Sequence, residues 1–177
     1  SVSAVAAGGG TLDLAVNLDD TASMKTGAPT WISQAKIGAN ALIDALLPMS
    51  GSSTTMVSMI PFRGCYNATG ANDCKNRLDY PSGHIAPLTN TSSLLHNAVN
   101  ALDGKGGSGT NNCEGLHESR IRLFQSGLAR TNAQKFLVLL SDTDSSYNLS
   151  KAGPYNVAAC KPSSGGTAEH KVNLLTY

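Results

Sequence analysis

An acid and two hydroxyl side chains stand at every second position near the start of this chain. Asp19, Thr21 and Ser23 directly follow residues 12–18, in which Leu or Val alternates with smaller or polar residues. Such alternation predicts a β-strand. In open α/β sheets, binding sites form beyond the carboxyl ends of strands. Carboxylate and hydroxyl oxygens suit Mg²⁺ or Mn²⁺, so this segment is a candidate metal-binding loop.

Two further oxygen-rich segments occur where such a site needs them. Residues 104–113 read GKGGSGTNNC and place Thr110 after a run of glycines. Residues 136–141 read FLVLLS, a short apolar run typical of a buried parallel strand, and Asp142 follows it. The sequence therefore offers three loops that could contribute oxygen ligands to one site.

The order and spacing of these loops resemble the von Willebrand factor A domain with its metal-ion-dependent adhesion site. Asp19, Thr21 and Ser23 match its Asp-x-Ser-x-Ser loop. Thr110 matches the threonine of its glycine-rich loop, and Asp142 matches the aspartate after its "VLL(S/T)D" strand. Three coincident motifs carry more weight than any one of them alone.

Longer stretches narrow the resemblance. The segments HIAPLTNTSSLLHNAVNAL, GTNNCEGLHESRIRLF and ARTNAQKFLVLLSD are similar to the A domains of bacterial tight-adherence pilus-assembly proteins. The similarity covers roughly residues 11–148. It implies a metal-dependent adhesion or protein-binding domain of a bacterial cell-surface or pilus-assembly protein. The alternative is a structural subunit of a larger extracytoplasmic assembly that keeps the fold with a metal-free site.

The resemblance also implies a role for each site residue. Thr21 and Ser23 are expected to bind Mg²⁺ (or Mn²⁺ or Ca²⁺) directly, and Asp19 and Asp142 to hold metal-bound waters. Thr110 is expected to enter or leave the coordination sphere as the site opens. A carboxylate from a protein partner then takes the vacant position. No catalytic residue is expected, because the sequence shows no nucleophile–base pair, and the chain is therefore not expected to be an enzyme.

Three residues depart from the family pattern. Thr21 replaces the usual serine but keeps the hydroxyl. Asp20 stands where a neutral residue is usual, so we expect a solvated carboxylate that adds negative charge beside the metal. Thr143 stands where the family mostly has glycine, so the last loop could have a different shape.

The elements that must position these residues alternate along the chain. Strands are predicted near 11–19, 54–62 and 134–141, helices near 29–47, 92–102 and 112–129, and a long loop over 63–90, with Trp31 in the core. Alternation of this kind predicts an α/β, Rossmann-like fold with a mostly parallel sheet and helices on both faces. We expect one domain over 11–177 after a flexible lead-in over 1–10.

A complete A domain would continue with two more strands and a helix after the strand at 134–141. The C-terminal strands are therefore expected to be missing from this sequence. We expect the chain to be part of a longer polypeptide, or a partner chain to supply the strands, because an open apolar strand edge invites aggregation.

Composition limits the class of partner. Charged residues make up 14% of the chain and the formal net charge is +1, so no basic surface for nucleic acid is expected. No apolar run reaches the length of a membrane span. Contact with a membrane is expected only through segments outside this sequence.

The cysteines indicate an oxidising compartment. Their even number, four, fits an extracellular or cell-envelope location. Four cysteines allow three pairings. The short loop between Cys65 and Cys74 favours a local disulfide, which leaves Cys113 and Cys160 as the second pair.

Overall fold

A parallel-rich sheet forms the centre of the computed structural model, which describes residues 10–47, 54–63, 83–104 and 112–142 of the 177. Its strands lie in the order β3-β2-β1-β4. Strand β1 pairs in parallel with β2 and with β4, and β3 pairs antiparallel with β2. The bounds are β1 Leu12–Asp19, β2 Thr55–Phe62, β3 Ala86–Thr89 and β4 Gln134–Leu140. The mostly parallel sheet predicted from the sequence is confirmed.

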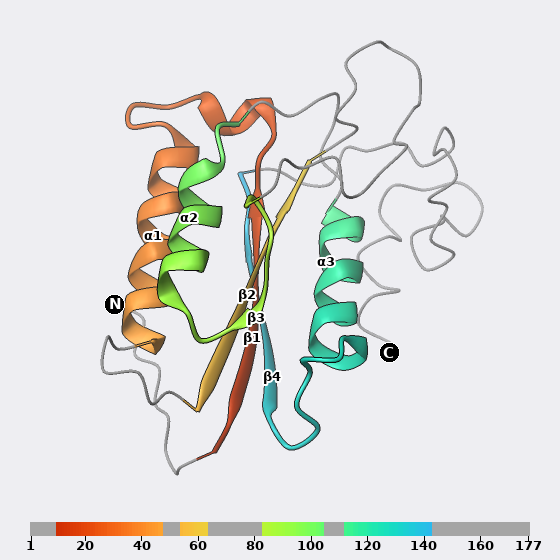
Figure 1. The fold of residues 1–177 in the computed structure, drawn as a ribbon. Coiled ribbons are helices and arrows are strands. Elements are labelled where there is room, and N and C mark those ends of the chain that lie inside the picture. The colour runs from red at the N-terminus through yellow and green to blue at the C-terminus, as the bar shows by residue number, and fades with distance from the viewer. Residues whose placement is uncertain (1–9, 48–53, 64–82, 105–111, 143–177) are drawn as a thin grey trace, which may run out of the picture.

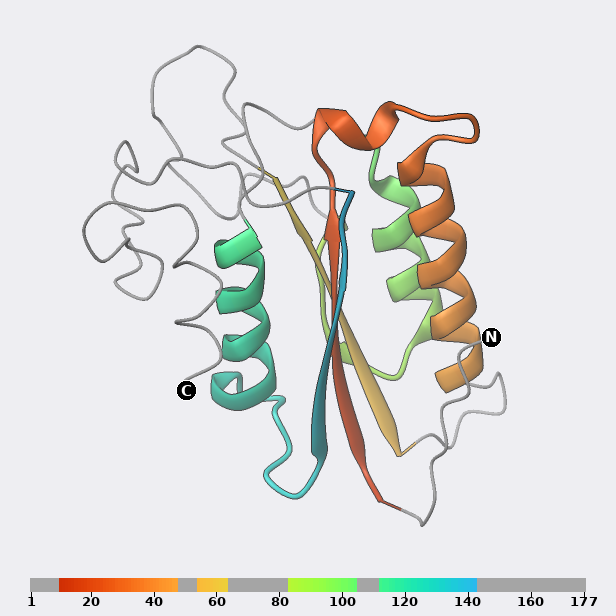
Figure 2. The ribbon, with the colours of Figure 1, turned by 180° about the vertical axis from the view of Figure 1, so that it is seen from behind.

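Helices cover both faces of this sheet (Figures 1 and 2). Helices α1 (Trp31–Leu46) and α2 (Ser92–Ala101) lie side by side on one face. Helix α3 (Asn112–Arg120) covers the other face and ends in a π-helical turn, η2 (Ile121–Gln125). A short 3₁₀ helix, η1 (Ala22–Lys25), follows β1. The chain therefore has the α/β layered architecture that the sequence predicted.

Helix α1 illustrates how the sequence specifies an element. Thr30 caps its N-terminus, and the Thr30 hydroxyl accepts a hydrogen bond from the backbone N–H of Ser33 at 3.4 Å. Ile32, Ala39 and Ile43 recur at helical spacing and are buried against the sheet. The apolar face thus fixes which side of α1 contacts β1.

Strand β1 is buried on both faces. Val16 and Leu18 are fully buried in the main core, on the side of α1 and α2. Ala15 is fully buried on the other side, in a small cluster with Ile60 and Leu123. Burial of one leucine side chain contributes about 1.5–3 kcal/mol. This strand therefore holds the two layers together and fixes where its carboxyl end lies.

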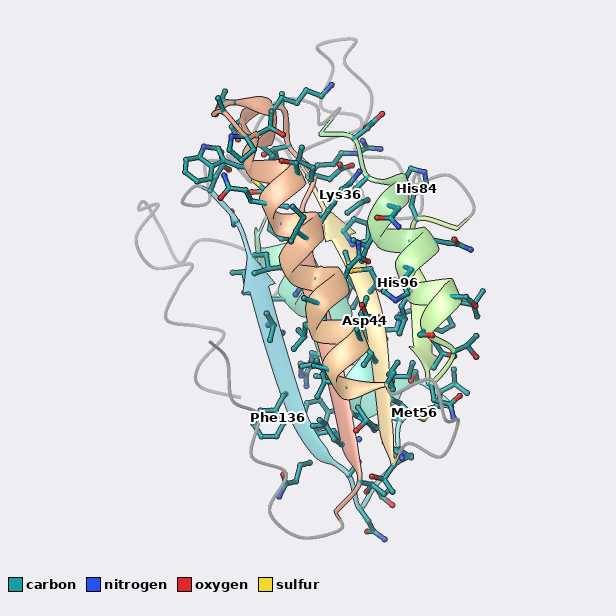
Figure 3. The ribbon with its side chains drawn as sticks, turned by 90° about the vertical axis from the view of Figure 1, so that its left-hand side faces the viewer. Lys36, Asp44, Met56, His84, His96 and Phe136 are labelled. Carbon is teal, nitrogen blue, oxygen red and sulfur yellow. The ribbon has the colours of Figure 1, made fainter. Side chains whose placement is uncertain are left out.

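Polar contacts join α1 and α2 at their outer side (Figure 3). His96 Nε2 of α2 lies 2.9 Å from Asp44 Oδ1 of α1, and His96 Nδ1 lies 2.7 Å from Asn40 Oδ1. Lys36 Nζ donates a hydrogen bond to the carbonyl oxygen of Asn100 at 3.0 Å. These contacts fix the relative position of two helices that bury their apolar faces in the same core.

Strand β4 is an edge of the sheet in the part of the chain that the structure describes. Its side chains are exposed on both faces: Phe136 is 54% exposed, and Leu137 and Leu139 are each 39% exposed. Phe136 projects outward from β4 (Figure 3). The expectation that the strands of a complete A domain after β4 are missing from this sequence is not tested by the described residues and stays a prediction.

Two predictions about individual segments were wrong. Residues 86–89, expected within a long loop, form strand β3. Trp31, expected in the core, is 48% exposed at the start of α1, because the buried stripe of that helix begins at the next residue.

Several other predictions concern residues outside the described part of the chain. Most of the expected lead-in lies there, as do Cys65, Cys74 and Cys160, and the side chain of Cys113 is not described either. Both disulfides therefore stay predictions. Within the described residues, no helix has the length and hydrophobicity that a membrane crossing requires.

Candidate metal centre

The buried carboxylate of Asp19 ends strand β1 and begins the site. Its Oδ1 accepts a hydrogen bond from the backbone N–H of Thr21 at 2.9 Å, and its Oδ2 accepts one from Ser141 Oγ at 2.6 Å. Asp19 has no exposed surface. Each carboxylate oxygen accepts more than one hydrogen bond, so Asp19 retains capacity for a water molecule.

The two hydroxyl groups lie next to each other, as the motif predicted. Thr21 Oγ1 and Ser23 Oγ are 2.9 Å apart, and Ser23 Oγ donates to Asp142 Oδ1 at 3.1 Å. Because the hydrogen of Ser23 is directed at Asp142, its lone pairs stay available to Thr21 or to a cation. A loop after β1 and the end of β4 thus meet, although 119 positions separate Ser23 from Asp142.

Four of the five predicted ligands therefore lie together at the carboxyl ends of strands β1 and β4. We call Asp19, Thr21, Ser23 and Asp142 the candidate metal centre. The fifth, Thr110, lies outside the described residues, and its place in the site stays a prediction.

The spacing of the hydroxyl oxygens fits a small divalent cation. In octahedral Mg²⁺, ligands about 2.1 Å from the metal lie about 3.0 Å from their neighbours. Thr21 Oγ1 and Ser23 Oγ, at 2.9 Å, match that separation. Ca²⁺, with bonds of about 2.4 Å and six to eight ligands, accepts neighbours about 2.8–3.4 Å apart, so the spacing is compatible with Ca²⁺ as well. The donor set and its spacing therefore suit a hard divalent cation such as Mg²⁺ or Mn²⁺.

The donors also disfavour softer metals. Among the described residues, no group of three or more His, Cys, Asp and Glu side chains could hold a metal ion. From the described residues, a metal in the candidate metal centre would draw on the hydroxyl oxygens of Thr21 and Ser23 and on the carboxylates of Asp19 and Asp142, directly or through water. That is hard-ligand chemistry, which Mg²⁺ and Mn²⁺ accept and which Zn²⁺ does not prefer.

Asp20 does not have the solvated position that we expected. Its side chain is 1% exposed, and its Oδ2 accepts a hydrogen bond from Arg63 Nη1 at 3.3 Å in a buried ion pair. Its Oδ1 accepts from the backbone N–H groups of Asp103 and Gly104 at 3.1 and 2.8 Å. The expectation of an exposed negative charge was wrong, because the end of β2 places an arginine beside this position.

Opposing influences act on the ionisation of Asp20. Burial raises the pKa of its carboxyl above the ordinary value, against the lowering effects of the Gly104 N–H, the Arg63 guanidinium and the Asp103 N–H. Asp103 adds a further upward contribution through its own negative charge. The arginine and the two N–H groups are thus the contacts that favour the charged form at a position where burial disfavours it.

Two residues of this region were missing from the predicted site. Ser141 directly precedes Asp142, and its hydroxyl was visible in the sequence as part of "LLSD". Arg63 directly follows β2, and only the pairing of β1 with β2 shows that it reaches Asp20. Ser141 therefore had a local signal in the sequence, whereas the contact of Arg63 with Asp20 could be recognised only from the sheet topology.

Among known proteins, solved structures match this chain in fold. No family model matches it, and no curated protein matches it significantly. The von Willebrand factor domain of Mfa5, the type V pili tip protein of Porphyromonas gingivalis, superposes with a TM-score of 0.57 at 17% identity. Two structures of the pilus adhesin SpaC from Lactobacillus rhamnosus GG, one in an open conformation, superpose with TM-scores of 0.55 and 0.53 at 17% and 15% identity.

These matches cover most of this chain but a smaller part of each relative. The Mfa5 match covers 78% of this chain and 40% of that one. The SpaC matches cover 75% and 73% of this chain, and 15% and 14% of those chains. The chain therefore has the fold of a von Willebrand factor A domain, the fold expected from its motifs, and it resembles domains found in pilus proteins.

Proposed function

We propose that this chain is a metal-dependent adhesion domain of a bacterial cell-surface or pilus protein. A divalent cation, Mg²⁺ or Mn²⁺, would bind at the candidate metal centre and accept a carboxylate from a protein partner. The fold and its likeness to pilus adhesin domains support the first part. The meeting of Thr21, Ser23 and Asp142 within hydrogen-bond distance is the observation that carries the second.

Each side chain has a distinct task in this proposal. Thr21 and Ser23 would supply neutral oxygen ligands, and Asp19 and Asp142 would orient metal-bound waters. The bound cation supplies a positive centre that attracts an incoming carboxylate. Neutral ligands leave more of that charge uncompensated than carboxylate ligands would, so a site of this kind favours an acidic ligand group.

The function does not require catalysis. The chain is proposed to bind rather than to react, in an extracellular or cell-envelope location, as part of a larger chain or assembly. The superposed proteins are a pilus tip protein and a pilus adhesin, which supports this location.

A structural subunit with the same fold and a metal-free site is the second candidate. The hydrogen bond from Ser23 to Asp142 favours it, because this contact gives each of the two side chains a partner without a cation. Metal binding distinguishes the two candidates.

Isothermal titration of the metal-free 177-residue chain with MgCl₂ and MnCl₂ tests the proposal. We expect one site per chain in the wild type, and none in Asp19→Ala or in Ser23→Ala. Asp13→Ala is the matched control, since Asp13 lies on the same strand and is equally buried. Wild type and Asp19→Ala binding the metal equally well would contradict the assignment, and a wild type without a site would favour the metal-free subunit.

The acidic ligand is tested with the Mn²⁺-loaded chain. Mn²⁺ speeds the relaxation of water protons through its bound waters, so a carboxylate that displaces one of them lowers this effect. A short peptide with one aspartate should lower it, and the same peptide with asparagine should not. Equal effects of the two peptides would contradict carboxylate capture.

A further inference from the structure

Asp20 lies within the candidate loop, but its carboxylate is turned toward other segments. Its Oδ1 accepts two backbone hydrogen bonds, from Gly104 N at 2.8 Å and from Asp103 N at 3.1 Å. The two donors are 84 and 83 positions away in sequence. One buried carboxylate oxygen therefore attaches the segment after α2 to the end of β1.

Gly104 is held from a second direction. Its φ is +65°, and a Cβ at this position would lie 3.0 Å from Lys25 Cγ and 3.4 Å from the carbonyl oxygen of Thr21. A side chain there would be strained by the backbone conformation and crowded by the segment from Thr21 to Lys25. The glycine thus lets the backbone lie against the same loop that carries the candidate ligands.

Arg63 balances the charge of this attachment. The side chains of Arg63 and Asp20 are 4% and 1% exposed, and their charged groups are 3.3 Å apart. A buried carboxylate without such a partner would be strongly destabilising. With this partner present, the carboxylate of Asp20 adds no unpaired negative charge beside the candidate metal centre.

We propose that Asp20 is a positioning residue of the candidate metal centre, which holds the start of the glycine-rich segment against the end of β1 while Arg63 neutralises its charge. This inference rests on the proposed function. It assigns a task to a residue that departs from the family pattern and that is not itself a metal ligand.

The sequence after Gly104 gives a reason for such an anchor. Residues 104–110 read GKGGSGT, and four of the seven are glycines. Glycine loses more conformational entropy on ordering than any other residue. Thr110 is a ligand in the proposed function, and fixing Gly104 would lower the entropic cost of its binding to a cation.

Hydrogen exchange of the metal-free chain tests the anchor. In Asp20→Ala, the Gly104 amide should exchange at least about tenfold faster relative to the Val16 amide, because its hydrogen bond is the one removed. Asp13→Ala is the matched control: it removes an equally buried carboxylate at the other end of β1 and should leave the Gly104 rate itself unchanged, because we expect this amide to exchange by local opening.

Metal affinity tests the positioning role. Loss of residues that orient metal ligands lowers affinity about 10- to 100-fold, and we expect Asp20→Ala to weaken Mg²⁺ binding about tenfold. The double variant Asp20→Asn with Arg63→Gln keeps an acceptor for both N–H groups and replaces the ion pair with a neutral hydrogen bond. It should restore slow Gly104 exchange and bring affinity to within about threefold of wild type.

The outcomes separate this inference from the proposed function. Unchanged Gly104 exchange in Asp20→Ala overturns the inference, whatever the metal does. Faster exchange with unchanged Mg²⁺ affinity also overturns it, since the anchor would then be structural. A wild type that binds no Mg²⁺ overturns the proposed function first. If Asp20→Ala does not fold, Asp20→Ala combined with Arg63→Leu, which removes the acceptor without leaving a buried unpaired charge, decides the same questions.

Discussion

Ser141 Oγ donates a hydrogen bond to Asp19 Oδ2 across 2.6 Å, and so joins the carboxyl ends of two parallel strands. The ladder between β1 and β4 ends at the pair Leu18 and Leu140. The side-chain bond extends the pairing by one residue, into the site. The other oxygen of Asp19, Oδ1, accepts a hydrogen bond from the backbone N–H of Thr21. The Asp19 carboxylate is therefore held at both of its oxygens before any cation binds.

Replacement of Ser141 should therefore weaken metal binding more than it weakens the fold. Ser141→Ala removes one donor to Asp19 and should lower Mg²⁺ affinity about tenfold, with a loss of about 1 kcal/mol of stability. Titration calorimetry and thermal melting measure the two effects.

Ser58 provides the matched serine. It is buried on β2 and donates to the carbonyl oxygen of Ala86 at 2.8 Å, away from the candidate metal centre. Ser58→Ala should lose a similar stability without a change in Mg²⁺ affinity. Equal loss of affinity in the two variants would mean that Ser141 acts through the fold alone.

Thr21 allows a test of the hydroxyl as a ligand. Thr21→Ser keeps the oxygen and should bind Mg²⁺ within about threefold of wild type, whereas Thr21→Val has a similar shape without the oxygen and should lose the site. Thr21 Oγ1 and Ser23 Oγ are 2.9 Å apart, so a serine at position 21 keeps its oxygen within reach of the same cation. Equal binding by the serine and valine variants would exclude Thr21 as a ligand.

The opposite end of β1 contains a cluster of charges that stabilises the fold. Asp13 is fully buried, and its carboxylate accepts hydrogen bonds from Arg130 Nε at 2.8 Å and from Lys135 Nζ at 2.5 Å. Burial alone would raise the pKa of Asp13, but the hydrogen bonds from Lys135 and Arg130 together outweigh it and hold the pKa below the ordinary 3.8.

A lowered pKa means that the folded chain favours the ionised form more than the unfolded chain does. The stabilisation is therefore fully present above pH 3.8 and is lost as pH falls through the lower pKa of the folded state. Asp13→Asn should cost about 3 kcal/mol at pH 7. The difference between its melting temperature and that of wild type should shrink below pH 3.8. A difference that stays constant down to pH 2 would contradict this account.

The local patterns were enough to predict most of the fold. Alternation over residues 12–18 predicted β1. Apolar residues at helical spacing predicted α1, with a start two residues before the observed one. The same alternation did not show that β1 is covered on both sides. Asp13 and Asn17, the polar positions of the pattern, are as buried as the leucines, because β1 is a central strand with helices on each face.

The errors share a physical cause, which is dependence on distant partners. Strand β3 has four residues and contains Pro87, so it lacks a strand signal of its own. Proline is tolerated there because β3 is the edge strand beside β2. The burial of Asp20 depends on Arg63, 43 positions away. The proximity of Thr21 and Ser23 was predictable because their spacing is local. That of Ser23 and Asp142, 119 positions apart, was predictable only from the family motif.

Two helical glycines should respond to alanine in opposite directions. At Gly115 of α3, an added Cβ would lie 2.9 Å from the Phe62 ring, whereas at Gly38 of α1 it would meet nothing within 4 Å. Gly115→Ala should destabilise by about 1–3 kcal/mol through overpacking. Gly38→Ala should stabilise by about 0.5–1 kcal/mol, the usual gain of alanine in a helix. Denaturant unfolding measures both, and a stabilised Gly115→Ala would mean that α3 does not pack on β2 this closely.

The exposed side chains of β4 lead to a last prediction, about association. Phe136 is 54% exposed, and Leu137 and Leu139 are each 39% exposed, on a strand whose one described neighbour is β1. An edge strand with apolar side chains on both faces is a template for pairing with another strand. We therefore expect the 177-residue chain, expressed alone, to self-associate at micromolar concentration.

Charge on this strand should suppress that association. Leu139→Lys places a lysine on the exposed edge strand and should shift the chain toward monomer in analytical ultracentrifugation. Ile37→Lys is the control, since Ile37 is 69% exposed on α1 and not on the strand edge, and it should leave the association unchanged. Strand pairing is backbone-directed, so the associated wild type should also protect β4 amides from hydrogen exchange. A wild-type chain that is monomeric, soluble and cooperative in its melting would show that β4 is already covered within these 177 residues.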